Sequence, residues 1–240
     1  SQTPFAEYLR TNDTKIGYQS IQPRNKKHLT YSAIYHQLLP LNNTQTILLL
    51  GLGNGNMIDN CLNKKSNLKI DAIDIDPIII KKAKENLLMN NKNIQVYQYD
   101  ARQFLYLTNK KYDLIVVDLY KNLEAPWSVN TKQFWQLIKN HCHQESIVAV
   151  NTVINHAQIN EYQINTIQTI FPHQYIPSNK KNIYQKLRLL TLKKLTQKQL
   201  SSTPLSLVKS QKQPKPNSII ITDDKSIIDY ISFKNKFTKQ

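Results

Sequence analysis

Apolar and polar residues alternate in blocks through the middle of the chain, from about residue 46 to residue 151. Short runs of Ile, Val and Leu are separated by segments in which apolar residues recur at helical spacing. The predicted strands are Ile47–Leu50, Leu68–Asp74, Ile94–Tyr97, Tyr112–Asp118 and Ser146–Val150, and the predicted helices are Asn56–Asn63, Pro77–Met89, Ala101–Leu107 and Thr131–Asn140. Strands that are apolar throughout are buried on both faces, so this order predicts a parallel sheet between two layers of helices.

The two flanks of this region follow other patterns. Residues 1–45 are predicted to form a small N-terminal extension, polar and loop-like at Gln19–Lys27 and helical at Leu29–Leu39. Residues 46–240 are predicted to form one α/β domain of the doubly wound, mostly parallel Rossmann-like type.

Beyond the alternating region we expect a helix, an antiparallel pair of strands, a basic loop and a short last strand. The corresponding residues are Ala157–Phe171, a pair that ends in Leu187–Leu192, the proline-containing Ser201–Asn217, and Ser218–Thr222.

The charge of the chain is strongly positive. It has 32 Lys and Arg residues against 16 Asp and Glu, a formal net charge of +16, and Pro172–Asn217 contains ten Lys or Arg and no acid. Nucleic acid is therefore one candidate partner. It is not the favoured one, because only four of the basic residues are arginine, whose planar fork suits phosphate recognition. We interpret the lysines mainly as a solvated exterior.

Other classes of protein are disfavoured by what the sequence contains. The longest apolar run, from Thr46 to Leu52, is too short for a membrane span, which needs roughly 18–20 residues. Cys61 and Cys142 are too few for a disulfide framework and lack metal-ligand spacing. We therefore expect no metal, no membrane partner and a cytoplasmic location.

Glycines and acids gather at the ends of the predicted strands. Three of the four glycines, Gly51, Gly53 and Gly55, follow the first strand, and Asp74, Asp100 and Asp118 follow the next three. In a doubly wound sheet, ligands bind at the carboxyl ends of the strands. Four consecutive strand ends are thus predicted to form one binding edge.

Each group on this edge suits an adenosine-type ligand. Glycines permit a tight turn that brings backbone N–H groups against a ligand, and an acid after the second strand can accept hydrogen bonds from both ribose hydroxyls. Asp100 could accept from the amine of an adenine and Ala101 N–H could donate to its ring, although an aspartate at this place is also typical of a helix cap. Asp118 would lie at the reaction centre.

The motifs on these strands resemble those of the spermidine synthase (polyamine aminopropyltransferase) family, which has the class I S-adenosylmethionine methyltransferase fold. The similar stretches are residues 47–55, Asp74-Ile-Asp-Pro77, Tyr99–Leu105, Tyr112–Tyr120, Thr30–Leu39 and Ile221–Asp224. The resemblance implies that Gly51, Gly53, Asn54, Gly55, Asp74, Ile75, Asp100 and Ala101 bind the cofactor. It also implies that Asp118 is the catalytic base and that Tyr35, His36, Tyr120 and Glu124 face the substrate.

The chemistry implied is transfer of an aminopropyl group from decarboxylated S-adenosylmethionine to a polyamine or another amine, with methylthioadenosine leaving. A homodimer is compatible with the resemblance, since dimers are common in that family. Tyr35 and His36 have an alternative interpretation as packing residues of an amphipathic helix.

Two positions depart from the family pattern and keep other functions open. Asn54 and Lys121 stand where acids are usual, so negative charge is missing where a cationic substrate would lie. Asn54 also suits the carboxylate of ordinary S-adenosylmethionine. The alternatives are therefore a methyltransferase that releases S-adenosylhomocysteine, acting on a small or nucleic-acid substrate, and a non-catalytic binder of the same fold.

Overall fold

The structure is a computed structural model of the 240-residue chain. It describes residues 6–9, 20–23, 31–53, 55–86, 91–120, 125–153, 157–178, 185–210 and 219–224. Near the start, β1 (Ala6–Leu9) and β2 (Ser20–Pro23) form an antiparallel pair. The prediction of a loop throughout Gln19–Lys27 is therefore wrong for β2, because pairing with β1 satisfies backbone groups of a segment whose side chains are mostly polar.

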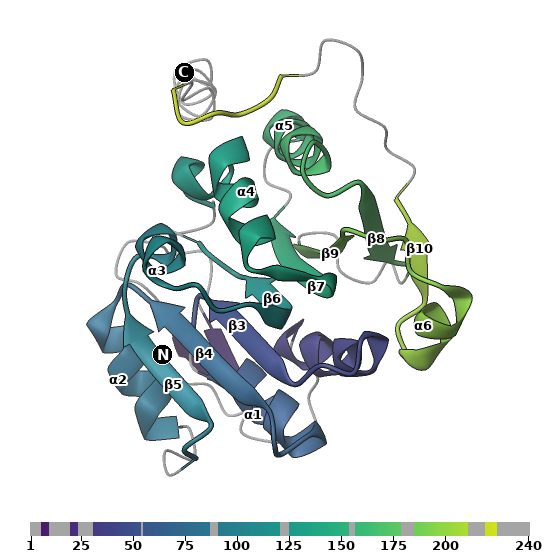
Figure 1. Ribbon diagram of the computed structural model, residues 1–240. Coiled ribbons are helices and arrows are strands. Elements are labelled where there is room, and N and C mark those ends of the chain that lie inside the picture. Colours follow the sequence, from purple (N-terminus) through teal and green to yellow (C-terminus); the bar gives the residue numbers. More distant parts are fainter. Residues whose placement is uncertain are drawn as a thin grey trace.

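One large sheet organises the described part of the chain (Figure 1). Its strands are β3 (Thr46–Leu50), β4 (Lys69–Asp74), β5 (Ile94–Gln98), β6 (Tyr112–Val117), β7 (Cys142–Val153), β8 (His173–Pro177), β9 (Gln185–Thr191) and β10 (Leu207–Lys209). Their order is β10-β8-β9-β7-β6-β3-β4-β5. The pairs from β5 to β7 are parallel, whereas β9 and β10 pair antiparallel with their neighbours. The prediction of a doubly wound, mostly parallel sheet is confirmed.

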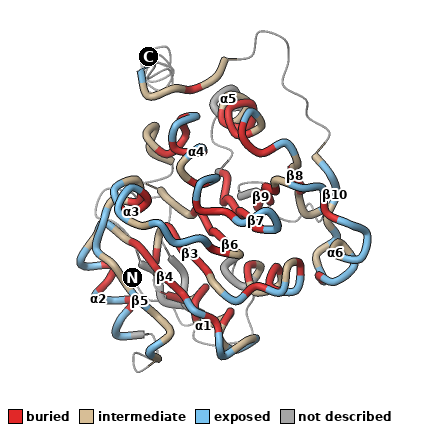
Figure 2. Tube along the Cα trace, in the orientation of Figure 1, coloured by how far each residue is buried: buried red, intermediate tan, exposed pale blue. Residues whose placement is uncertain are grey.

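Helices cover both faces of this sheet. They are η1 (Tyr31–Leu41), α1 (Asn56–Lys64), α2 (Pro77–Asn86), α3 (Ala101–Leu107), η2 (Trp127–Val129), α4 (Lys132–Asn140), α5 (Ala157–Gln168) and α6 (Gln197–Ser202). Residues of η1, α1 and α2 form one apolar core with one face of the strands, and residues of α3, α4 and α5 form a second core with the other. Figure 2 shows the central strands β3, β4 and β6 as largely buried, whereas β5, at the edge of the sheet, is only partly buried.

The predicted elements of the alternating region are all present, with shifts of a few residues at their ends. Ala101–Leu107 is a helix as predicted, because Asp100 caps its first turn. The fifth strand is much longer than expected: β7 begins at Cys142 and ends at Val153, since pairing with both β6 and β9 extends it. The helix predicted at Leu29–Leu39 is the 3₁₀ helix η1, which contains Pro40.

The C-terminal prediction is wrong in two places. Part of the predicted loop at Ser201–Asn217 is ordered as the end of α6 and as β10, which adds an eighth strand beside β8. Within the described residues 219–224, the predicted last strand is reduced to a single bridge at Thr222. Three prolines suggested a loop, but Leu205 and Leu207 pack against the core and fix this segment.

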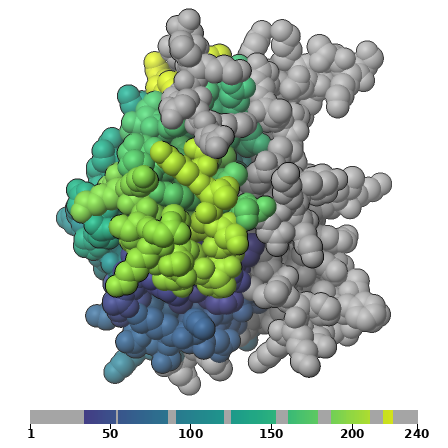
Figure 3. Space-filling model, turned by 90° about the vertical axis from the view of Figure 1, so that its right-hand side faces the viewer, coloured from purple at the N-terminus to yellow at the C-terminus, as the bar shows by residue number. Residues whose placement is uncertain are grey.

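The 3₁₀ helix η1 and helix α6 lie against each other although they are far apart in sequence. Gln199 Nε2 donates to Leu41 O at 3.2 Å, and Thr203 Oγ1 donates to Gln37 O at 2.7 Å. Figure 3 shows the green and yellow residues around α6 and β10 beside purple η1, above blue α1. Residues 31–41, which the sequence placed in an extension, thus contribute to the core of the sheet domain.

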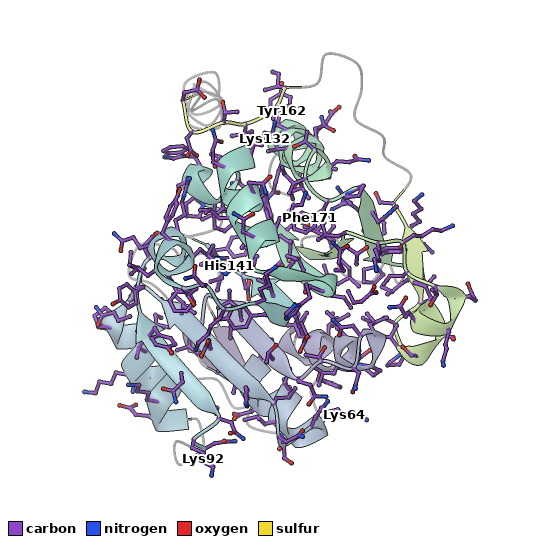
Figure 4. The ribbon with its side chains drawn as sticks, in the orientation of Figure 1. Lys64, Lys92, Lys132, His141, Tyr162 and Phe171 are labelled. Carbon is purple, nitrogen blue, oxygen red and sulfur yellow. The ribbon has the colours of Figure 1, made fainter. Side chains whose placement is uncertain are left out.

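Helix α3 is held at its far end by a buried histidine. His141, directly after α4, has Nε2 2.9 Å from Leu105 O and Nδ1 2.7 Å from Lys110 O (Figure 4). The ring therefore joins the ends of α3 and α4 to the segment that enters β6. This fixes the direction in which α3 presents its other end to the edge of the sheet.

Candidate active site at the carboxyl edge of the sheet

The central strands end at a switch point, where the chain leaves β3 for β4 on one side and later returns to β6 on the other. Gly51 N donates to Ile73 O of β4 at 2.9 Å, and Asp118 N donates to Leu50 O of β3 at 2.9 Å. The three strand ends are therefore tied together at one level. Ligands of doubly wound sheets bind at such a point.

The first strand leaves the sheet through a turn that requires glycine. Gly51, Gly53 and Gly55 have φ values of +95°, +54° and +86°, and Gly55 is the residue that caps α1. At Gly51 a Cβ atom would lie only 2.2 Å from Asp118 O. The absence of a side chain at Gly51 thus allows β3 to pass directly against the end of β6. Asn54, the fourth residue predicted here, lies outside the described residues.

Asp74 faces this glycine turn from the end of β4. Its Oδ2 accepts from Leu52 N and its Oδ1 from Asp76 N, both at 3.0 Å. Burial raises the pKa of Asp74, while the backbone N–H groups of Asp76, Leu52 and Ile75 oppose that rise. A carboxylate has about four acceptor positions, so the two hydrogen bonds at 3.0 Å leave capacity for ribose hydroxyls. The neighbouring Ile75 is 66% exposed, an apolar surface beside the carboxylate.

Asp100 lies directly before α3, next to the end of β5. Its Oδ1 accepts from Arg102 N at 2.9 Å and from Gln103 N at 3.2 Å. This oxygen therefore caps the first turn of α3, as the alternative interpretation of Asp100 predicts. Oδ2 makes no hydrogen bond within the described part of the chain. Ala101 is buried at the first position of the helix.

Asp118 is held by a residue that the sequence reasoning missed. Asn151, at the end of β7, donates from Nδ2 to Asp118 Oδ1 at 2.8 Å, and its backbone oxygen accepts from the Tyr120 hydroxyl. Asn151 is a buried polar residue directly after the apolar run Ile147–Val150 of β7, and that break in the run was the available signal. A fifth strand, β7, therefore contributes to the site.

The described residues predicted for the substrate lie in different surroundings. Tyr120 lies beside Asn151, whereas Tyr35 is only 2% exposed and belongs to the apolar core, as the packing interpretation predicts. His36 lies near the end of α1, where burial and the charge of Lys64 lower its pKa. Glu124 and Lys121 lie outside the described residues.

A bidentate ion pair closes one side of the site. Arg102, two residues after Asp100, donates from Nη1 and Nη2 to the two carboxylate oxygens of Asp223 at 2.9 and 2.7 Å. The same Nη1 donates to Ser128 O at 3.0 Å. Arg102 therefore fastens both the C-terminal segment and the loop after Asp118 to the start of α3.

The C-terminal segment 219–224 has further anchors on the helices. Ile221 accepts from Lys132 N at 2.8 Å and donates to Thr166 Oγ1 at 2.9 Å, and its side chain is fully buried. Figure 4 labels Lys132 beside this segment. The segments Asp100–Arg102 and Thr222–Asp224, which are distant in sequence, thus meet through the ion pair between Arg102 and Asp223.

The described residues offer no alternative centre of metal or thiol chemistry. They contain no cluster of three or more His, Cys, Asp or Glu side chains placed to hold a metal ion. Cys61 and Cys142 are buried and unbridged, and burial raises the pKa of each thiol to about 12. None of the described helices has the length and apolarity of a bilayer span.

Comparison with known structures defines the class of fold. The human methyltransferase-like protein 13, solved with S-adenosylhomocysteine, aligns with 71% of this chain and 83% of its own at a TM-score of 0.60 and 18% identity. A probable spermidine synthase from Corynebacterium glutamicum aligns with 92% of this chain and 94% of its own at a TM-score of 0.66 and 12% identity. The fold is that of the Rossmann-like methyltransferases.

Sequence comparison then defines the family. Residues 28–185 match the model of the spermine/spermidine synthase domain. A probable polyamine aminopropyl transferase from Bifidobacterium longum is 24% identical over 256 residues, which cover 93% of this chain and 57% of that protein. The chain thus spans little more than half the length of this relative. The chain belongs to the spermine/spermidine synthase family.

We predict that Gly51→Ala destabilises the protein by about 2–4 kcal/mol, because a side chain there combines a positive φ with a collision against the Asp118 carbonyl. Urea unfolding measures the loss. Gly53→Ala is the comparison: its φ of +54° lies in the left-handed well, so we expect a loss of roughly 1–2 kcal/mol. Equal losses for the two variants would contradict the close approach as the main cause.

We predict that Asp223→Asn lowers the free energy of unfolding by about 1 kcal/mol at pH 7, a modest value because the pair is partly exposed. The bonds from Arg102 lower the pKa of Asp223 in the folded state. The stabilisation is therefore complete above the unfolded pKa of about 3.9 and is lost as pH falls through the lower folded value. Urea unfolding of wild type and variant from pH 7 to pH 3 measures this convergence.

The control for this pair is Glu85→Gln, which breaks the exposed ion pair between Lys82 and Glu85 on α2. We expect no measurable change in unfolding for this variant. A difference between wild type and Asp223→Asn that stays constant down to pH 3 would contradict the assigned role of the carboxylate.

Proposed function

We propose that the protein transfers an aminopropyl group from decarboxylated S-adenosylmethionine to an amine, with Asp118 as the base. The observation that carries the proposal is the convergence of the Gly51–Gly55 turn, Asp74 and Asp118 on one edge, together with membership of the family. The human methyltransferase-like protein of the same fold holds S-adenosylhomocysteine, which supports a thioether-nucleoside ligand here.

The residues present fit such a ligand in charge and in hydrogen-bonding capacity. The N–H of Gly53, which donates to no atom of the described residues, would approach the chain that carries sulfur, and the remaining acceptor positions of Asp74 would bind the ribose hydroxyls. Oδ2 of Asp100 would accept from the exocyclic amine of adenine, with Ala101 N–H at the ring. The exposed side chain of Ile75 would cover one face of the base.

In the proposed reaction the acceptor is a primary amine, which is protonated at neutral pH. Asp118 takes one proton, so that the amine nitrogen becomes a nucleophile. A carbon–nitrogen bond forms at the methylene carbon next to the sulfonium while the carbon–sulfur bond breaks. Its electron pair goes to sulfur, which neutralises the sulfonium charge, and methylthioadenosine leaves.

Asn151 would be the positioning residue for this step. Its amide donates to Oδ1 of Asp118, which fixes the carboxylate plane, and its carbonyl accepts from Tyr120. A hydrogen bond to the charged form stabilises a carboxylate. Asn151 would therefore hold Asp118 ionised and aimed toward the amine.

A second candidate function is methyl transfer from S-adenosylmethionine itself. Asn54 and Lys121 favour it, because both reduce negative charge where a propylamine arm or a polyamine would bind. The net charge of +16 also opposes the approach of a dication. Asn54 would tolerate the carboxylate that distinguishes the ordinary cofactor from its decarboxylated form.

We predict that Asp118→Asn lowers kcat for aminopropyl transfer by about 10²–10⁴-fold, the usual effect of losing a general base, while nucleoside binding persists. Methylthioadenosine release from decarboxylated S-adenosylmethionine and putrescine measures kcat, and calorimetry measures binding.

Asn151→Ala is expected to lower kcat about 10-fold or more with little change in KM, since the base would lose its orientation.

The matched control is Asp113→Asn, which removes an acid from the opposite end of the same strand. Asp113 Oδ2 accepts from Gln45 N and Thr46 N, so this variant should lower stability but leave kcat within a few-fold of wild type. Wild-type kcat in Asp118→Asn would reject Asp118 as the base.

Calorimetry with both cofactors at one ionic strength separates the two candidate functions. We predict that decarboxylated S-adenosylmethionine binds at least about tenfold tighter than S-adenosylmethionine, a difference of about 1.4 kcal/mol. The reverse order would reject aminopropyl transfer and favour methyl transfer.

A further inference from the structure

A buried arginine lies on the antiparallel side of the sheet, in β9, which β7 separates from β6 and Asp118. Arg188 is in β9, opposite Val150 of β7, and is only 5% exposed. Leu187 and Leu189 pack into one core and Leu190 into the other. Because side chains alternate along a strand, Arg188 lies on the same face as Leu190, the face that α3, α4 and α5 cover.

One end of the Arg188 guanidinium is bound and the other is not. Nη1 donates to Gln174 Oε1 at 2.9 Å and to Ser210 Oγ at 3.2 Å. Nε is buried without an acceptor, and Nη2 makes no hydrogen bond within the described residues. Nε and Nη2 form the side-on edge of the guanidinium, which matches the two oxygens of a carboxylate or phosphate.

Gln174 adds a third donor beside this edge. It lies in β8, is 4% exposed, and its Nε2 is also buried without a partner. Its amide orientation is set by Arg188, because only the carbonyl oxygen can accept from Nη1. The buried groups at this place therefore have N–H donors in excess, and the described residues supply no acceptor for them.

The charge of Arg188 is uncompensated in the described part of the chain. No carboxylate there forms an ion pair with it, in contrast to Arg102, whose fork is filled by Asp223. Buried charges are normally paired, because desolvation of an isolated ion is expensive. Burial lowers the pKa of Arg188 to about 10, so it remains a cation at neutral pH.

The surroundings add positive charge and no described acid. Lys194 and Lys209 lie close enough to lower the pKa of His173, the residue before Gln174. Lysine outnumbers arginine 28 to four in this chain, yet the buried cation is an arginine, the residue whose fork binds oxyanions on two atoms.

We propose that Arg188 and Gln174 form a binding site for a small oxyanion, a carboxylate or a phosphate, separate from the nucleoside site. Nε and Nη2 of Arg188 bind its two oxygens side-on, and Gln174 Nε2 donates to one of them. This binding compensates the buried cation and ties β9 to β8, near the start of the segment that follows β10.

The experiment is thermal unfolding of the whole chain in inorganic phosphate, in acetate and in sodium chloride at one ionic strength and pH 7. We expect phosphate or acetate to raise Tm by about 2–4 °C over chloride at a concentration several times Kd. The anion that raises Tm more identifies the class of ligand, which is a phosphate or a carboxylate. Equal Tm values in all three salts would overturn the proposal.

Two variants locate the effect. Arg188→Met should abolish the response to the anion. Gln174→Glu places a carboxylate about where the Gln174 Oε1 atom contacts Nη1, so it should raise Tm in chloride and remove the response. The result for Gln174→Glu is informative even if the Arg188→Met variant does not fold. A fall in Tm of Gln174→Glu, or an unchanged response to the anion, would overturn the proposal.

The matched control is Lys198→Met on α6, which removes one positive charge from an exposed position. It should keep the full response to the anion. Loss of the response in this variant as well would show a general effect of net charge and would also overturn the proposal.

Discussion

The close approach of two strand ends is the constraint on which the site depends. Gly51 passes against the carbonyl of Asp118, so that the turn after β3 and the acid after β6 share one edge. A side chain at Gly51 would separate the glycine turn from the carboxylate of Asp118. Asp74 strengthens the same arrangement by accepting from Leu52 inside the turn. One acid thus shapes the turn and is also the group that we propose to bind the ribose, at the cost of a carboxylate whose pKa burial raises.

Arginine has two contrasting roles in this chain. The fork of Arg102 is filled by Asp223, and through Ser128 it joins α3, the loop after β6 and the C-terminal segment. Arg188 is more deeply buried and has only neutral partners, Gln174 and Ser210. The guanidinium has the same geometry in both residues, so their roles differ because of the groups that accept its hydrogen bonds. The first joins three segments beside the start of α3, and the second leaves donors that we propose to bind an oxyanion from outside the chain.

Family and charge point in different directions for the acceptor. The family model and its relatives support a polyamine, whereas Asn54, Lys121 and the net charge of +16 oppose a multiply charged cation. The proposed contacts to the nucleoside are insensitive to this conflict, since they would use the N–H of Gly53 and the carboxylates of Asp74 and Asp100. The identity of the transferred group is therefore decided at the far end of the site, by the charge around the sulfonium.

The sequence by itself determined the alternation of strands and helices, the glycine turn and the acids that end β4 and β6. These follow from local physics: apolar runs must be buried, glycine alone tolerates the positive φ of the turn, and parallel strands share a carboxyl edge. Only the tertiary structure decided that Asn151 holds Asp118, that Arg102 meets Asp223, that Tyr35 is a core residue and that β10 extends the sheet. Each of these contacts joins residues that are far apart in the chain. Local patterns in a single sequence do not specify which distant side chains will pair.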